Sequence, residues 1–525
     1  MSLLANRLRQ GLFRLATAGR PTSSVAAEDV LEDSITWEEA KPFESIPGPK
    51  PLPIPLYGNF WRFSKFGTYG KMGVSQLRLK LREQFGDIVR LTGMGRKDVV
   101  FLFDSADFEK MHRNESVWPF RQGLECMTYY QKNMRSDLFK WRSLAVAQGK
   151  EWYEMRSSVN PVMMQPRRTK MYVEPIVTIA EEFIERMKKI RDDKMELPSD
   201  FANELNKWAL ESIAYIALDT RLGCLVDRLE PDSRAQLLIA AVADMFDLFY
   251  RLDFVPSVWR HVSTKNWRKF VKTMDNITGF AYEIVSGKMN ELQSRKDDGD
   301  APKSVLEALL HSKNPEYAFG MAVDMLIAGI DTTSNTTGTA LTLLATNPEK
   351  QEKLFEELAR ILPTKQTPIT AEKLNDMKYL KAVIKESLRV QPIFPGNSRD
   401  TVKDLVIGGY QIPKGTRLLS AHDIACKDEK NFKQADKFIP ERWLKSENHS
   451  DLDSPDGSRF AFLPFGFGPR MCIGRRFAEL EIEVLLAKIM RNFRLSYHYG
   501  DMEWTIYVLR RPSKPLKFRA EERKT

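Results

Sequence analysis

The most constraining feature of this chain is a ten-residue loop at 465–474, with the sequence FGFGPRMCIG. It holds a single cysteine, Cys472, just before a run at 476–490 that is predicted to be helical. A thiol at the start of a helix meets unpaired backbone N–H groups and the positive end of the helix dipole, and both favour the thiolate. A lone cysteine is more often an inert, buried side chain, so the rest of the loop decides between the two interpretations.

The other residues of the loop suit a thiolate that binds haem iron, a recognised role for cysteine. Glycines, Gly474 among them, let the backbone approach a flat macrocycle where a Cβ would collide. Phe465 would shield the sulfur from water, and Arg470 would reach a haem carboxylate. The full pattern F-x-x-G-x-R-x-C-x-G resembles the haem-binding loop of the cytochrome P-450 monooxygenases. The resemblance implies haem b as the cofactor and Cys472 as the axial ligand of its iron.

Composition excludes several other classes of protein. Four cysteines are widely spaced without a C-x-x-C pair, and the six histidines show no H-E-x-x-H spacing, so neither a disulfide scaffold nor a zinc site is indicated. The net charge is +10. Its cations are interleaved with acids, as in residues 181–189, which is typical of a solvated helix face and argues against nucleic-acid binding.

The N-terminus predicts a mitochondrial presequence. Before Glu28 there is no acidic residue, and leucines recur at helical spacing among four arginines: Arg7, Arg9, Arg14 and Arg20. Such an Arg-rich, acid-free, amphipathic segment is typical of a presequence, although a disordered basic tail has a similar composition. We assign residues 1–45 to the presequence and a mobile acidic link. No run reaches the roughly 18 apolar residues that would span a bilayer.

The fold class is expected to be mainly α with a smaller β component, a single large helical domain at 46–525 with small sheets around a buried haem. The spacing of apolar residues predicts helix over most of residues 150–400, including a helix at 348–362 that begins at a proline. Strands are expected at 87–91 and 99–103, and a further pair at 406–410 and 416–419. A stripe at helical spacing is expected in the core: Leu205, Trp208, Ala209, Ile213 and Ile216.

A second motif lies in a long helical stretch that begins near Pro315. Ala328 and Gly329 precede Thr332 by four and three residues, so the three share a helix face, and the small residues leave room for a flat cofactor and for dioxygen. Asp331 and Thr332 are candidate catalytic residues, because an acid beside a hydroxyl suits proton delivery. A helix with a back-bonded threonine and a surface acid is the alternative. The segment resembles the oxygen-activating helix of the same family.

Two further motifs resemble motifs of the same family and occur in the same order along the chain. Glu386 and Arg389 form an E-x-x-R pair, which alone is normally a surface ion pair. With Arg442 they resemble the family's structural triad, which serves folding around haem. By the same resemblance four residues would hold the haem propionates: Trp152, Arg156, Arg399 and Arg470.

Residues 328–336 and 472–481 further resemble the mitochondrial clan, and residues 118–121 and 392–399 are most similar to its insect members associated with foreign compounds. This resemblance implies electrons from NADPH through a ferredoxin reductase and a small acidic ferredoxin of the 2Fe–2S type. The residues expected to dock that ferredoxin are Lys381, Lys385, Arg475 and Arg476. Aromatic and basic residues at 254–260 and 267–270 suit a peripheral membrane contact. The alternative is an ordinary helix–loop–helix packed on the core. The expected location is the matrix side of the inner membrane.

The sequence therefore predicts a mitochondrial haem-thiolate monooxygenase that inserts one oxygen atom from O2 into a lipophilic small molecule, either a xenobiotic or a steroid-like compound. One alternative is a haem-thiolate isomerase or dehydratase that rearranges peroxides without external electrons. Such an enzyme needs no proton relay, so Asp331 and Thr332 argue against it. The other alternative is a non-catalytic haem or lipid carrier.

Overall fold

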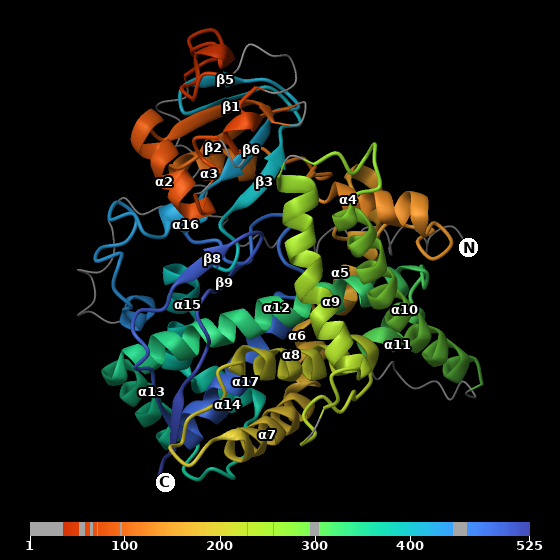
Figure 1. Cartoon of the computed structure of the whole chain (residues 1–525), viewed down its shortest axis with the longest axis vertical. Helices are drawn as coiled ribbons and strands as arrows, with labels where there is room; N and C mark the ends of the chain where they lie inside the picture. Colours follow the sequence, from red (N-terminus) through yellow and green to blue (C-terminus); the bar gives the residue numbers. More distant parts are fainter. Residues whose placement is uncertain are drawn as a thin grey trace, which may run out of the picture.

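The computed structural model describes residues 35–51, 58–63, 67–70, 72–94, 97–227, 229–255, 257–294, 304–444 and 459–524. Figure 1 shows a sheet-containing region at the top and a larger helical region below it, with helix α12 running across the middle of the molecule. The expected fold class, mainly α with small sheets, is confirmed. The presequence assigned to the N-terminus falls almost wholly on residues 1–34, which lie outside the described residues.

Helices account for most of the described chain. The main ones are α2 (Val74–Phe85), α3 (Ser105–Arg113), α5 (Gly149–Met163), α7 (Val173–Ile190), α8 (Phe201–Leu218), α9 (Arg234–Phe249), α10 (Lys265–Ser294), α12 (Tyr317–Thr346), α13 (Pro348–Ile361), α15 (Lys378–Val390) and α17 (Arg475–Asn492). Shorter ones are α4 (Glu125–Tyr129), α6 (Pro166–Lys170), α11 (Val305–Leu310), α14 (Ala371–Asp376) and α16 (His422–Ala425), with π-helical turns at η3 (Tyr130–Met134) and η4 (Tyr250–Phe254).

Helix α12 is long and threonine-rich, which would be unusual for a buried helix if its hydroxyls lacked partners. Most of them donate to the carbonyl four residues earlier; Thr336 donates to Thr332 and Thr342 to Gly338. The hydroxyls are therefore satisfied within the helix. Against α12 packs α8, whose predicted apolar stripe is buried, as expected.

Gly329 does not have the role expected from its sequence position. A Cβ at Gly329 would lie 2.5 Å from Cγ1 of Ile213 on α8, closer than real Cβ contacts. The missing side chain therefore lets α12 and α8 approach each other, rather than leaving room for a cofactor. Ala328, by contrast, is exposed although most of its helix is buried.

The largest sheet has the strand order β1-β2-β6-β3. Its strands are β1 (Ile88–Met94), β2 (Lys97–Leu102), β6 (Arg417–Ser420) and β3 (Asn397–Asp400), and β6 runs parallel to β2. Three two-stranded sheets join β4 (Leu405–Ile407) to β5 (Tyr410–Ile412), β7 (Phe493–Ser496) to β10 (Arg519–Glu522), and β8 (Trp504–Ile506) to β9 (Arg510–Pro512).

The expected pairing of 406–410 with 416–419 is wrong. The first segment forms its own hairpin, β4 with β5, because Gly408 and Gly409 both adopt positive φ (+59° and +80°) and make a two-residue turn between them. Strand β6 is thereby free to pair with β2 and β3.

The segment that precedes the first strands packs on the sheet region. The Lys41 N–H donates to the Gly409 carbonyl, and the Arg90 N–H donates to the Pro47 carbonyl. Gly48 is needed there, because a Cβ would lie 2.1 Å from the Arg90 carbonyl oxygen. From residue 35 onward the expected mobile link is thus in contact with the fold. Among the described residues, no helix combines the length and apolar character needed to cross a membrane.

Candidate functional site

The loop that carries Cys472 is held by its own backbone. Gly466 and Gly468 adopt positive φ (+72° and +73°), which side chains other than glycine rarely tolerate. The resulting turns let the Cys472 N–H donate to the Phe465 carbonyl at 2.8 Å. Helix α17 begins immediately afterwards, with Gly474 as its N-cap. A Cβ on Gly474 would meet no protein atom within 4 Å, so this side of the loop is open.

Cys472 has an accessible side chain. Burial among protein atoms nevertheless raises the pKa of its thiol, while the Gly474 N–H and the charge of Arg156 act in the opposite direction. The N–H group at the helix start thus favours the thiolate, as expected from the sequence, but burial acts more strongly in the opposite direction. A cation bound at the sulfur is needed to hold the thiolate.

Four arginines converge near this loop: Arg121, Arg156, Arg399 and Arg470. Arg156 and Arg470 flank the indole of Trp152, with their guanidinium carbons 6.0 and 4.4 Å from its ring centre. Burial lowers the pKa of Arg156 to about 10. Burial and the neighbouring arginines lower the pKa of Arg470 to about 8. So many buried cations require anionic partners.

The protein supplies too few of those partners. The carboxylates that act on the four arginines are Glu115 and Asp324. Arg156 Nε and two nitrogens of Arg470 (Nε and Nη1) are buried without a hydrogen-bond partner among the described residues. The cluster therefore carries excess positive charge, and a ligand with two carboxylates would balance it. Haem, with its two propionates, fits this charge and the cysteine ligand together.

Sequence reasoning identified three of the four arginines and missed Arg121. Its pKa is lowered to about 10 by burial and by Arg399, and its charge acts on both Asp324 of α12 and Cys472. Only the fold brings residue 121 to this place, so motif spacing gives no signal for it. Arg470 Nη2 donates to the Ala147 carbonyl (2.6 Å) and to Gln148 Oε1 (2.9 Å), which fixes the ligand loop against the start of α5.

Asp331 and Thr332 are neighbours on α12 but are not hydrogen-bonded to each other in this structure. The Thr332 hydroxyl donates to the Ala328 carbonyl at 2.5 Å, the back-bonded geometry of the alternative interpretation. Asp331 is buried, and burial raises the pKa of its carboxyl to about 6. A carboxyl with that pKa exchanges protons readily near neutral pH. The alternative interpretation of Asp331 as a surface acid is therefore wrong.

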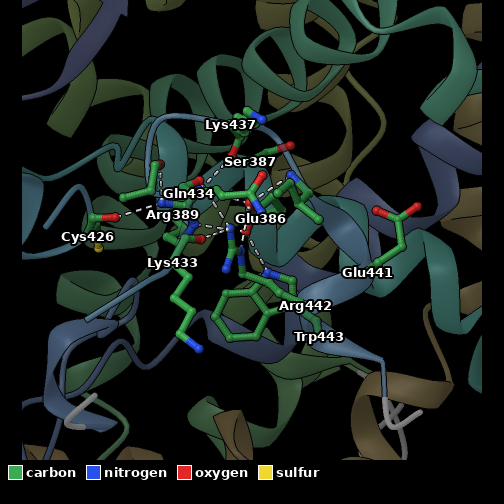
Figure 2. Close-up of polar contacts among 12 residues, drawn as sticks. Glu386, Ser387, Arg389, Cys426, Lys433, Gln434, Lys437, Glu441, Arg442 and Trp443 are labelled. Carbon is green, nitrogen blue, oxygen red and sulfur yellow. Dashed lines mark hydrogen bonds and ion pairs between the residues drawn. The ribbon is translucent and has the colours of Figure 1, made fainter. Parts of the chain in front are cut away.

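The structure brings Glu386, Arg389 and Arg442 together, and Figure 2 shows both guanidinium groups pointing at the same carboxylate. Arg389 donates to Glu386 through Nε (2.9 Å) and Nη2 (2.8 Å), and Arg442 donates through Nε (3.1 Å). Glu386 and Arg389 are fully buried. The E-x-x-R pair is thus an interior ion pair, unlike the usual surface case.

Two donors beyond the predicted triad complete this network. The Trp443 indole N–H donates to Glu386 Oε2 at 2.8 Å, and the Ile439 N–H donates to Oε1 at 2.9 Å. Arg389 also donates to three backbone carbonyls, those of Cys426, Ala435 and Lys437. The network therefore ties α15 to the backbone that leads toward the ligand loop.

The four residues expected to dock ferredoxin lie on α15 and on the first turn of α17. Lys385 is exposed, with its ammonium 5.9 Å from the Trp443 ring. Lys381 is half-buried and interacts with Glu483. Arg475 pairs with Glu479 at 2.9 Å, whereas Arg476 is exposed and makes no ion pair with a described residue. The face is therefore basic but contains acids as well, which sequence spacing did not reveal.

The aromatic segment expected to touch a membrane divides into two parts. Trp259, Trp267 and Phe270 are buried, and the two indoles stack with their ring centres 4.6 Å apart. They belong to the core, as the packing alternative would have it. The exposed apolar side chains of this region are instead Phe254, Val258 and Val262; Pro256 lies outside the described residues.

Glu481 is a buried acid that the sequence motifs did not single out. It projects from α17 toward α12, where the Thr333 hydroxyl donates to its Oε2 at 3.4 Å, and Oε1 has no partner among the described residues. Burial raises the pKa of this carboxyl to about 8. Glu481 is therefore protonated in the fold at neutral pH.

This gives a prediction for stability against pH. Because the folded-state pKa is raised, the stability contributed by the protonated carboxyl is fully present below about pH 4.5 and lost as the pH rises through 8. We expect Glu481→Gln to match the wild type at pH 5 and to be more stable at pH 9, by on the order of 3 kcal/mol. Thermal unfolding at both pH values measures this. Glu479→Gln on the same helix is the control, and equal pH dependence in wild type and Glu481→Gln would contradict the assignment.

Comparison with known proteins identifies the family of this chain. The family description Cytochrome P450 matches residues 47–519. The chain is 41% identical to "Probable cytochrome P450 12b2, mitochondrial" of Drosophila melanogaster, over 96% of this chain and 94% of that protein. It is 38% identical to "Cytochrome P450 CYP12A2" of Musca domestica, over 93% of both chains. It is 40% identical to "Cytochrome P450 12b1, mitochondrial" of Drosophila acanthoptera, over 88% of this chain and 86% of that protein.

Proposed function

Because the chain belongs to the cytochrome P450 family and is a haem-dependent monooxygenase, we propose that it works in the mitochondrion and oxygenates a lipophilic small molecule with electrons from a ferredoxin. Bound haem supplies the activation of dioxygen. The observation that carries the site assignment is the accessible Cys472 beside a buried cluster of arginines with excess positive charge. In this proposal the Cys472 sulfur would bind the haem iron.

The chain's own residues have three tasks in this reaction. Trp152, Arg156, Arg399 and Arg470 are proposed to bind and orient the propionates, and we add Arg121 to them. Ala328, exposed on α12, leaves room beside the haem for dioxygen and substrate. The Thr332 hydroxyl and the Asp331 carboxyl are proposed to move protons from the interior toward the oxygen site. For this the Thr332 Oγ1 proton must swing away from the Ala328 carbonyl.

The proposed electron donor is a small acidic ferredoxin that an NADPH-dependent reductase keeps reduced. What supports it is a set of four cations near the ligand loop. Arg475 and Arg476 stand in the first turn of α17, directly after that loop, and Lys381 and Lys385 stand on α15, where Lys381 interacts with Glu483 of α17. Charges of this kind steer encounter with an oppositely charged partner. The relatives that carry "mitochondrial" in their names point the same way.

The test is charge reversal on α15. We expect Lys381→Glu with Lys385→Glu to slow reduction by ferredoxin on the order of tenfold or more at low salt. The loss is expected to be smaller at high salt, because the screening length is only about 10 Å at 0.1 M. Stopped-flow reduction across a salt series measures this. Lys385→Glu alone separates steering from the loss of the Lys381–Glu483 interaction.

A matched control reverses two lysines on another helix. Lys265 and Lys272 are exposed on α10, on the opposite side of the molecule from α15 in Figure 1. Their reversal should leave reduction by ferredoxin unchanged. In the α15 variant, haem content and peroxide-driven turnover should stay normal. Unchanged ferredoxin-driven turnover at low salt would place the docking face elsewhere.

We also propose where the protein resides and how it is divided. Residues 1–45 act as presequence and link, and residues 46–525 as the catalytic domain. The enzyme contacts the matrix side of the inner membrane peripherally, through Phe254, Val258 and Val262, whose side chains are 50–60% exposed. Apolar side chains of this kind bind the interface of a membrane when cations flank them, and Arg268 lies exposed nearby on α10.

A further inference from the structure

Glu115 is a buried carboxylate that none of the sequence motifs includes. It lies two residues after the end of α3, and its side chain is only 4% exposed. Its Oε1 is 2.8 Å from Arg399 Nε, so one of the arginines of the cluster is paired with it. The same oxygen is 2.6 Å from His112 Nδ1, on the last turn of α3. A buried acid with two such partners has one well-defined position.

The other side of Glu115 touches the ligand loop. Its Oε2 lies 3.6 Å from the position that a Cβ on Gly468 would take, and it has no hydrogen-bond partner among the described residues. Arg399 reaches the same loop, because its Nη2 donates to the Phe467 carbonyl at 3.4 Å. The Glu115–Arg399 pair therefore lies between α3 and the loop that carries Cys472.

His112 fixes the orientation of this acid without neutralising it. Burial lowers the pKa of the imidazole, so the ring is uncharged and must carry its proton on Nδ1 to donate to Glu115. The ring packs near Phe460 and Phe467, with ring centres 6.3 and 5.9 Å away. Glu115 thus has one cationic partner, Arg399, and one uncharged partner, His112, in a low-dielectric interior where a charge acts over a long range.

We propose that Glu115 is a positioning residue for the haem reaction: it fixes Arg399 for a propionate and its negative charge lowers the reduction potential of the haem bound at Cys472. The charge argument is that one more negative charge near the iron disfavours the added electron. The inference holds whichever protein donates the electrons, because it concerns the haem and not the docking face.

The test separates charge from shape in the haem-loaded protein. Glu115→Gln keeps the shape and removes the charge. At the wild-type midpoint potential, the ratio of reduced to oxidised haem should rise about tenfold, a shift of ~59 mV for one electron. Glu115→Asp keeps the charge but shortens the reach to Arg399. It should leave the potential near the wild-type value and speed haem transfer to an acceptor apoprotein. Glu109→Gln, which removes a half-buried acid of α3 that pairs with the exposed Arg113, is the control and should change neither quantity.

The results that overturn the proposal are equally definite. If the midpoint potential of the haem in Glu115→Gln equals that of the wild type, the charge of Glu115 does not act on the haem and its role is limited to packing. If Glu115→Gln does not retain haem, Arg399→Gln is titrated instead. Removing the cation must then shift the potential in the opposite direction, to lower values, and an unchanged potential in that variant also overturns the proposal.

Discussion

Glu386→Gln is expected to prevent the chain from reaching a stable haem-binding fold. The substitution leaves Arg389 and Arg442 in a buried site without their counter-charge, while three further carbonyl contacts hold Arg389 in place. Breaking a buried, hydrogen-bonded ion pair from one side costs about 3–5 kcal/mol. That is a large part of a stability of roughly 5–15 kcal/mol. Soluble yield and the ratio of haem absorbance to protein measure the effect.

An exposed ion pair gives the matched control for this prediction. Asp247 pairs with Arg251 four residues along the chain, and the side chains are 31% and 54% exposed, respectively. Asp247→Asn should therefore cost less than about 1 kcal/mol and leave haem content unchanged. Full haem loading and an unchanged melting temperature in Glu386→Gln would show that the triad is dispensable for the fold.

Thr332→Ala and Asp331→Asn are expected to separate oxygen consumption from product formation. Either change removes a group proposed to move protons toward the oxygen site, while the ligand loop is untouched. NADPH and oxygen should still be consumed, but the yield of oxygenated product per NADPH should fall by about tenfold to a hundredfold, within the range for general acid catalysis. The missing electrons should appear as hydrogen peroxide, which is measured together with NADPH and product.

Thr339→Ala is the control for loss of a hydroxyl from the same helix. Thr339 donates to the carbonyl of Asn335 in the same back-bonded geometry as Thr332, but it is buried farther along α12. Its removal should leave the product yield per NADPH unchanged. An unchanged yield in Thr332→Ala would make that residue merely structural, with the back-bonded hydroxyl as its whole role.

The parts of the site that sequence predicts well are those in which spacing itself determines the geometry. Glu386 and Arg389 are three residues apart on a helix, so they must share a face. The glycines of the ligand loop specify turns that few other residues adopt, and Gly466 and Gly468 take positive φ there. Spacing does not predict burial, however. The Glu386–Arg389 pair lies in the interior because the chain beyond α15 covers it.

The parts that sequence did not predict depend on contacts between distant segments. Arg121 and Glu115 precede Cys472 by some 350 residues, and no local pattern places them beside its loop. The role of Gly329 was misjudged for the same reason, since the approach of Ile213 from α8 is a property of helix packing. The pairing of β4 with β5 does have a local signal, because Gly408-Gly409 between two short strand-like runs, 405–407 and 410–412, favours a two-residue hairpin.

The most direct test of the haem-thiolate assignment is the carbon-monoxide difference spectrum of the reduced, full-length protein, recorded beside Cys472→His. The wild type should show the red-shifted Soret band of thiolate-ligated haem. Cys472→His should still bind haem, but without that band and without oxygenation of substrate. A wild-type spectrum that lacks the band would contradict the assignment, and so would a Cys472→His variant that keeps both the band and the oxygenation.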